Sequence, residues 1–109
     1  MIKCFHHKGL ELFFTTGNKT GIKPHHAITL KTQLDAMHAA ESIDDLNTPA
    51  SWQLLQLTGD LSGFWSVNVS GNWRLIFRYI ENHIELIDYL DYRLPKLQEN
   101  AEHFISYPY

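Results

Sequence analysis

The sequence predicts an α+β domain, with helices in its first half and antiparallel strands in its second. Two stretches, Trp65–Val69 and Trp73–Tyr79, alternate their side chains with the period of a half-buried strand. Before them, an apolar stripe at helical spacing runs through Leu30, Leu34 and Met37. A helix with one apolar face must bury it against another element, and the sheet is the simplest partner.

Length and composition set the outer limits of this prediction. The 109 residues are enough for one domain with a buried core and too few for two. A hydrophobic content of 44%, one cysteine and no visible signal peptide or membrane span indicate a cytoplasmic globular protein without an internal disulfide. The net charge of −3 argues mildly against strong nonspecific binding of nucleic acid, although it is compatible with a local basic patch.

The N-terminal half is predicted to hold one short strand, at residues 2–5, and two helices. The first helix ends at Gly17, and its apolar residues have the spacing i, i+3 and i+4: Leu10, Phe13 and Phe14. The second helix begins near Pro24, because proline suits a first helical turn. Its buried stripe consists of Ala27, Leu30, Leu34, Met37 and Ala40.

The two alternating stretches are predicted to form a β-hairpin. Their apolar residues are odd-numbered, so both sets share a face only if paired residue numbers sum to an even value. A three-residue loop, 70–72, satisfies this condition and pairs Val69 with Trp73, with positive φ at Asn72. A two-residue turn would instead place Ser70 opposite Trp73 and break the pattern.

The even-numbered residues of the hairpin are predicted to form a second, solvated face. Three pairs lie across it: Asn68 with Arg74, Ser66 with Ile76, and Phe64 with Arg78. Guanidinium groups match phosphate oxygens, and an exposed ring can stack on a base. The alternative, which geometry alone favours, is an ordinary solvated face whose arginines pair with Glu81, Glu85 or Asp88.

Further elements are predicted on both sides of the hairpin. Ser42, with Asp45 three residues later, fits a capped helical turn, and residues 52–57 begin the sheet. Residues 84–90 are apolar at both parities, which is typical of a strand covered on both sides, and their faces cannot be assigned from the sequence. Residues 94–109 are expected to form a C-terminal extension.

Histidines are plentiful, but their arrangement is not that of a metal site. His6-His7 and His25-His26 are adjacent pairs, whereas metal ligands usually stand at i, i+4 or Cys-x-x-Cys spacing. The glycines are scattered and form no phosphate-binding loop. We therefore expect no metal and no cofactor.

Arg74 and the segment Asp91-Tyr92-Arg93 contain the chemistry needed to cleave RNA through its own 2′-hydroxyl. Such a reaction needs a proton acceptor, a proton donor and a group that stabilises the phosphorane charge. Arg74 suits the third role, and Asp91 or Tyr92 can transfer protons, whereas Arg93 does not deprotonate. The alternative, which these residues alone favour, is that Asp91 and Arg93 are surface charges and Tyr92 a half-buried core residue.

At these positions the sequence resembles the HigB toxins, a branch of the RelE/ParE superfamily of bacterial toxin–antitoxin systems. The resemblance covers residues 1–93, which we take as the domain. It is carried by Met1-Ile2-Lys3 with Phe5, His7-Lys8-Gly9-Leu10, Asp45-Leu46-Asn47, Leu57-Thr58-Gly59-Asp60, Gly63-Phe64-Trp65-Ser66-Val67, Asn72-Trp73-Arg74 and Asp88-Tyr89-Leu90-Asp91-Tyr92. These segments are specific together, whereas none would suffice alone.

The resemblance implies a fold with two helices packed on one side of a small, twisted, mostly antiparallel sheet. It implies a messenger-RNA endonuclease that works in the ribosomal A site, inhibits translation and is neutralised by a HigA-like helix-turn-helix antitoxin. The toxin is expected to contact operator DNA only through this antitoxin, in a complex that represses its own operon.

The resemblance also implies roles for single residues. Arg74 matches the arginine after the family's Asn-Trp and is expected to bind the scissile phosphate. Asp91 and Tyr92 match a C-terminal Asp-Tyr-His whose histidine is replaced here by Arg93, and Thr58 stands where a lysine usually precedes Gly-Asp. The expected catalytic residues are Arg74, Asp91, Tyr92 and Arg93, and the expected RNA-binding residues are Arg74, Arg78, Phe64, Asn68 and Thr58.

These departures keep a second function open. A chain with this scaffold and weak or no catalysis would act with its antitoxin in operon repression, or would poison a non-RNA target such as gyrase. The altered C-terminal triad favours this alternative. Retention of Arg74 with Asp91-Tyr92 favours the endonuclease.

Overall fold

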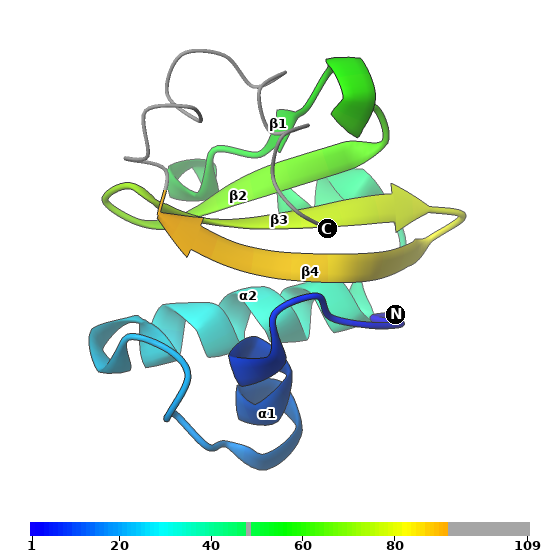
Figure 1. Cartoon of the computed structure of the whole chain (residues 1–109). Coiled ribbons are helices and arrows are strands. Elements are labelled where there is room, and N and C mark those ends of the chain that lie inside the picture. Colours follow the sequence, from blue (N-terminus) through cyan, green and yellow to red (C-terminus); the bar gives the residue numbers. More distant parts are fainter. Residues whose placement is uncertain (48, 92–109) are drawn as a thin grey trace.

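The computed structural model describes residues 1–47 and 49–91 and confirms the α+β architecture (Figure 1). Within these residues, two α-helices precede a sheet of four strands in the order β1-β2-β3-β4, with all neighbouring strands antiparallel. The elements are α1 (Lys8–Thr16), η1 (Pro24–His26), α2 (Ala27–Ala39), η2 (Ile43–Leu46), η3 (Ala50–Trp52), β1 (Leu55–Gln56), η4 (Gly59–Leu61), β2 (Phe64–Ser70), β3 (Trp73–Ile80) and β4 (His83–Asp91), where η denotes a 3₁₀ turn. The expected extension, 94–109, lies outside the described residues.

The end of α1, the η2 turn and the buried face of α2 have the local causes that the sequence suggested, whereas the cap at His7 was not predicted. The α1 helix begins where the His7 ring accepts a hydrogen bond from the Leu10 N–H, and it ends at Gly17 with φ of +82°. Ser42 and Asp45 form a reciprocal capping box at η2. The predicted stripe of α2 is buried: Ala27, Leu30, Leu34, Met37 and Ala40.

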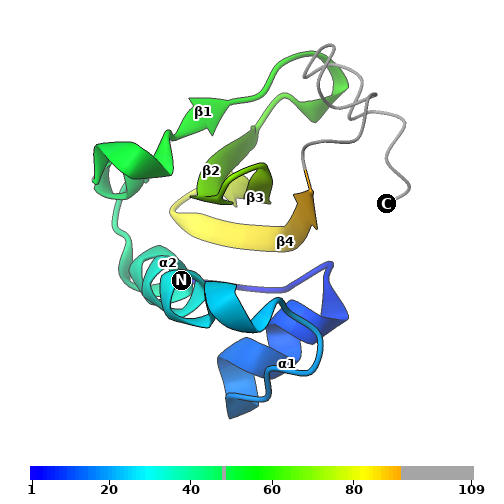
Figure 2. The ribbon, with the colours of Figure 1, turned by 90° about the vertical axis from the view of Figure 1, so that its left-hand side faces the viewer.

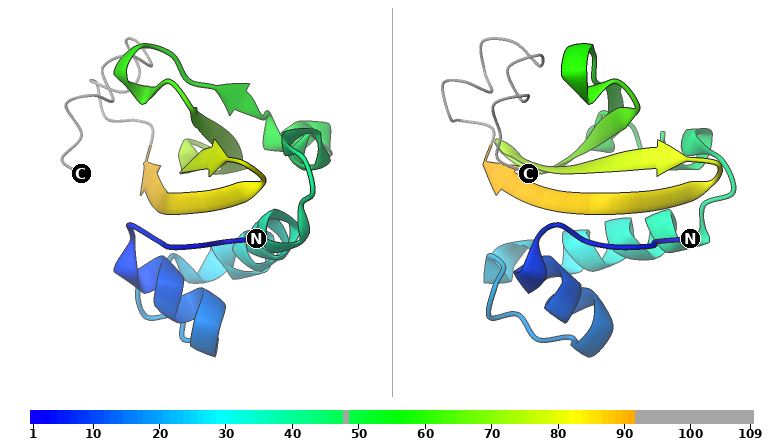
Figure 3. Two further views of the ribbon diagram at one scale, coloured as in Figure 1. Left: turned by 90° about the vertical axis from the view of Figure 1, so that its right-hand side faces the viewer. Right: turned by 45° about the vertical axis from the view of Figure 1, so that its right-hand side comes forward.

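The sheet is covered on both faces. The helices lie on one face, and the green segment that follows β1 and contains η4 crosses the other (Figures 1, 2 and 3). Between helices and sheet lies the main core, which includes Leu10, Leu30, Leu34, Met37, Val67, Leu75, Phe77, Ile84 and Ile87. A second cluster fills the opposite face and consists of Leu57, Leu61, Phe64, Ile76 and Leu90, with Leu86 packed against it.

The register of the hairpin was predicted correctly, but its turn was not. All three predicted pairs across the even face are present. The turn, however, has two residues: Ser70 pairs with Trp73, and Gly71, not Asn72, has the positive φ, +56°. The pairing shifts between Asn68 and Ser70, so a bulge at Val69 absorbs the extra residue and restores the even sum beyond it.

A second bulge explains why β4 is apolar at both parities. Ile76 pairs with Asp88 but Arg78 pairs with Glu85, so the β3–β4 register shifts by one residue in between. Leu86 lies in this irregularity and has a positive φ of +56°. Beyond it, the residues that face the helices change from even to odd numbers.

The N-terminal segment lies beside β4 on the edge away from β3. Isolated parallel bridges join Ile2 to Ile84 and Phe5 to Ile87, instead of the continuous strand expected at residues 2–5. Cys4, the single cysteine of the chain, is exposed. This segment protects the outer edge of β4.

A close backbone contact fixes the loop between the helices. A Cβ on Gly9 would lie 2.8 Å from the Gly21 Cα, and a Cβ on Gly21 would lie 2.6 Å from the Gly9 Cα. Real Cβ atoms do not approach backbone this closely. The two glycines therefore allow the loop to pack on the first turn of α1.

We expect Gly9→Ala to lower the free energy of unfolding by about 1–3 kcal/mol, because the added methyl group meets rigid backbone. Intrinsic helix propensity alone would make the same change stabilising by about 0.5–1 kcal/mol. The sign of the change in the urea midpoint therefore distinguishes the steric effect from the effect of helix propensity. A variant that unfolds at higher urea than the wild type would show that the two backbones do not touch.

Candidate functional site

Arg74, the expected phosphate ligand, lies near the start of β3 and donates hydrogen bonds to Ser66 and Gln53. Its Nε donates to the Ser66 Oγ at 3.1 Å, and its Nη2 donates to the Gln53 carbonyl at 2.9 Å. Gln53 follows the η3 turn with a left-handed φ of +47°, which gives this carbonyl its direction. These bonds orient the guanidinium and offset part of its cost of burial.

The face that carries Arg74 is not the solvated surface that the alternation suggested. Arg74 is 7% exposed, and Ser66 and Ile76 are each 1% exposed. The segment that follows β1 and contains η4 covers this face through Leu57 and Leu61. Its sequence has no strong periodicity that would predict a packed layer. The prediction of a solvated face was therefore wrong.

Phe64 is likewise buried rather than displayed for base stacking. It is 9% exposed and packs in the second cluster with Leu57 and Leu61. Its ring thus fills the space between sheet and covering segment. The expectation that it presents an exposed stacking surface is corrected accordingly.

The other expected RNA-binding residues lie beside Arg74, farther along the sheet and on the segment that covers it. The Arg78 guanidinium is 3.6 Å from the Glu85 carboxylate, so the ion-pair interpretation holds for this arginine. Asn68 is half-buried beside Arg74, and its backbone carbonyl accepts a bond of 2.7 Å from the Gln33 amide. Thr58 is exposed and precedes η4.

Asp91, the expected proton acceptor, is the last residue of β4 and pairs with Trp73. Directly opposed residues share a face of the sheet, so Asp91 lies on the helix side with Trp73. Arg74 pairs with Leu90 on the opposite face. The structure thus brings Arg74 and Asp91 to the same end of the sheet but on different faces, and Tyr92 and Arg93 lie outside the described residues.

Asp88 is a buried acid that sequence reasoning treated only as a possible ion-pair partner. It is 1% exposed and pairs with Ile76 on the face of Arg74. One of its oxygens accepts the Tyr89 N–H at 2.9 Å, and no hydrogen-bond partner of the other is found in the structure as described. Because Asp88 lies within a mostly apolar strand, the sequence did not indicate that this acid would be buried on the face of Arg74.

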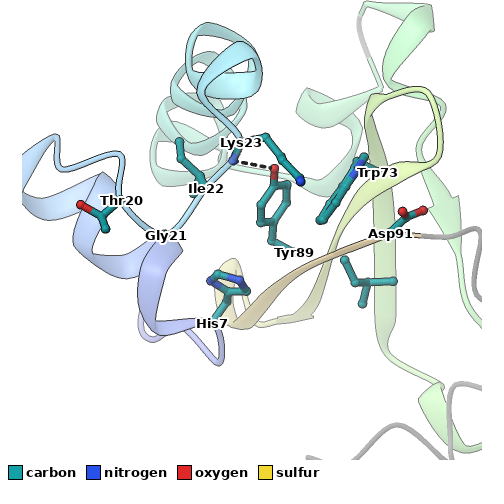
Figure 4. Close-up of a pocket in the computed structure, with 9 residues that line it drawn as sticks. His7, Thr20, Gly21, Ile22, Lys23, Trp73, Tyr89 and Asp91 are labelled. Carbon is teal, nitrogen blue, oxygen red and sulfur yellow. Dashed lines mark hydrogen bonds between the residues drawn. The ribbon is translucent and has the colours of Figure 1, made fainter.

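A cavity of about 370 Å³ opens beside Asp91 on the helix side (Figure 4). It lies between the loop that precedes η1 and the ends of β3 and β4. Its walls include Lys23, Trp73 and Tyr89. The sequence did not reveal this cavity, because its walls come from segments about fifty residues apart that share no motif.

The chain is similar to known proteins over nearly all of the residues described above. A model of the family described as the RelE-like toxin of type II toxin-antitoxin system HigB matches residues 3–93. The chain is 37% identical over 92 residues to the endoribonuclease HigB of Proteus vulgaris, which covers 84% of this chain and 99% of the relative. The chain belongs to the HigB toxin family.

A second HigB relative agrees. Toxin HigB-1 of Vibrio cholerae serotype O1 is 31% identical over 88 residues, which covers 80% of this chain and 92% of that toxin. Membership in a type II toxin family implies an antitoxin as partner. In this HigB-family chain, none of the described helices is long and apolar enough to cross a membrane, and no described group of three or more His, Cys, Asp or Glu residues could hold a metal ion.

Two histidines near the cavity of the HigB-family chain have lowered pKa values. Burial lowers the pKa of His7, and the Asp88 carboxylate partly opposes this shift by raising the pKa. Burial also lowers the pKa of His26, and the charges of His25 and Lys23 lower it further. The His26 Nδ1 is 2.6 Å from the Tyr89 hydroxyl, whose pKa is raised by burial.

We expect the free energy of unfolding to fall as pH decreases below about 6.5, the ordinary histidine value. The folded pKa values of His7 and His26 are lowered, so the unfolded chain binds more protons in this range and stability is lost as they bind. His7→Asn keeps a capping oxygen for α1 but does not titrate, so its urea midpoint should change less with pH. His38→Asn is the matched control, because His38 is an exposed residue of α2 whose charge is not among the causes of either pKa shift. Equal pH slopes for both variants would contradict the assignment.

Proposed function

We propose that this HigB-family toxin is a messenger-RNA endonuclease that acts on the translating ribosome in the cytoplasm. Its antitoxin partner is HigA-like, and the toxin meets operator DNA only through it. The main observation in support is that Ser66 and Gln53 orient the Arg74 guanidinium. Arg74 is the residue that the family resemblance expects to bind the scissile phosphate. The relative named an endoribonuclease aligns over most of this chain and supports the same activity.

The proposed reaction is attack of the RNA 2′-oxygen on the adjacent phosphorus. The new P–O bond forms as the bond to the 5′-oxygen of the next nucleotide breaks, which leaves a 2′,3′-cyclic phosphate and a 5′-hydroxyl. Arg74 stabilises the negative charge that develops on the phosphorane oxygens. A guanidinium that stays charged in a largely dehydrated site interacts more strongly with this charge than it would in water.

The site is less complete in groups for proton transfer than in groups for binding the phosphate. Asp91 and Tyr92 are the candidate groups on this chain, and Arg93 supplies charge but no proton. Asp91 lies on the face opposite Arg74. We therefore propose that ribosomal RNA groups assist proton transfer, so that cleavage depends on the ribosome.

A second function is favoured by the separation of Arg74 and Asp91 and by arginine in place of histidine at position 93. On this alternative the chain has weak or no catalytic activity. It acts with its antitoxin in operon repression, or it binds a non-RNA target such as gyrase. Fold alone does not decide between the two functions.

The deciding experiment is expression in a bacterial host without the antitoxin, with mapping of messenger-RNA 5′ ends. We expect in-frame cuts within translated messages that fall by about 100-fold or more in Arg74→Ala, as for loss of an oxyanion-type donor. Lys31→Ala, which removes an exposed cation paired with Asp35, is the control and should cut like the wild type. Growth arrest without new ends, or no arrest by soluble folded protein, would reject the endonuclease.

Ser66 is expected to act as a positioning residue for Arg74. Ser66→Ala removes the acceptor for the Arg74 Nε and should slow single-turnover cleavage of ribosome-bound message by about tenfold, as expected for one hydrogen bond to a charged group. Binding to the ribosome should change much less, because the charge remains. A cleavage rate equal to that of the wild type would show that the bond to Ser66 is not needed to orient the guanidinium.

A further inference from the structure

The cavity beside Asp91 has walls that are fixed before any ligand arrives (Figure 4). The contact between Gly9 and Gly21 holds the loop against α1. The Lys23 N–H then donates to the Tyr89 hydroxyl oxygen at 3.3 Å. Because the loop is tied to both α1 and β4, its side of the cavity costs little ordering free energy on binding.

Hydrogen bonds at Tyr89 also determine which way its hydroxyl points. Its oxygen accepts from Lys23, and its single proton is then available for the His26 Nδ1, 2.6 Å away. His26 is 2% exposed and packs edge-on to both Tyr89 and Trp73. The aromatic floor of the cavity is therefore rigid.

The chemistry of the lining combines flat rings with charges of both signs. The Trp73 and Tyr89 rings lie 4.7 Å apart at 34°. The Lys23 ammonium lies 5.7 Å from the centre of the Trp73 ring, and Asp91 stands at the same rim. A ligand that fits has a planar ring for the floor, an anionic group for the ammonium and hydrogen-bond donors for the carboxylate.

We propose that this cavity binds one nucleotide of the RNA substrate, a subsite distinct from the place of the scissile phosphate. The base packs against Trp73, and the phosphate pairs with Lys23. The inference rests on the proposed endonuclease function, because it takes the ligand from the RNA that function would cleave. Stacking on aromatic residues and charge pairing are the usual means of holding single-stranded RNA.

The position of the cavity suits this role. Trp73 and Arg74 are consecutive residues of β3 and point to opposite faces of the same sheet end. A strand of RNA that passes around this end can place one phosphate at Arg74 and a neighbouring nucleotide in the cavity. A protein segment is the weaker fit, because most of the exposed lining is charged or aromatic rather than aliphatic.

The test is titration of ¹⁵N-labelled full-length protein with each of the four 5′-mononucleotides, and separately with inorganic phosphate. We expect at least one mononucleotide to shift the Trp73 indole N–H signal, assigned with Trp73→Phe, with a dissociation constant of about 1 mM, as is ordinary for so small a ligand. Lys23→Ala should weaken this binding by about two- to fivefold, since it removes an exposed charge pair. Lys31→Ala, on the outer side of α2, should bind as the wild type does.

Each binding result supports or overturns the nucleotide subsite without reference to a cleavage assay. Saturating mononucleotide without a shift at Trp73 overturns the subsite, as does equal affinity of Lys23→Ala and the wild type. Equal shifts with inorganic phosphate would reduce the site to an anion site and would also overturn the proposal. Because binding is measured without ribosomes, a chain that binds mononucleotides but cuts no message would reject the endonuclease and leave the nucleotide cavity standing.

Discussion

The bulge at Leu86 determines which side chains of β4 face the helices, and both cores depend on it. Ile84 packs against the helices before the bulge, and Ile87 and Tyr89 do so after it. Without the extra residue, Tyr89 would lie on the opposite face from Ile84, because a slip of one residue exchanges the two faces of a strand. A positive φ at a leucine costs about 1–3 kcal/mol, and burial of three large side chains offsets this cost.

The same irregularity links the helical layer to the candidate site. It places Tyr89 where its hydroxyl meets His26 and the Lys23 backbone, and it puts Asp91 on the face of Trp73. The β3–β4 pairing therefore fixes the cavity and the end of the candidate catalytic segment together. A change in register would disturb the core and the site at once, which separates this site from one carried on independent loops.

Periodicity in the sequence predicted the parts of the fold in which one face is buried and the other is polar. The α2 stripe is of this kind and was confirmed. The hairpin register was confirmed as well, although the second face of the hairpin is covered rather than solvated. The turn was mispredicted because a parity rule treats every residue as paired, whereas Val69 forms a bulge. The site was predicted only as residue identities: no pattern showed that an irregular segment covers Arg74, or that Lys23 lies over Trp73.

The acidic net charge does not decide whether this chain can engage RNA, because local placement of cations matters more at short range. Fields from exposed charges are screened within about 8 Å at physiological ionic strength. Arg74 is instead nearly buried, where screening is weak, and Ser66 and Gln53 hold its guanidinium in one orientation. Net charge then governs how fast the toxin meets a polyanion, whereas the oriented guanidinium governs what happens to a phosphate once it is bound.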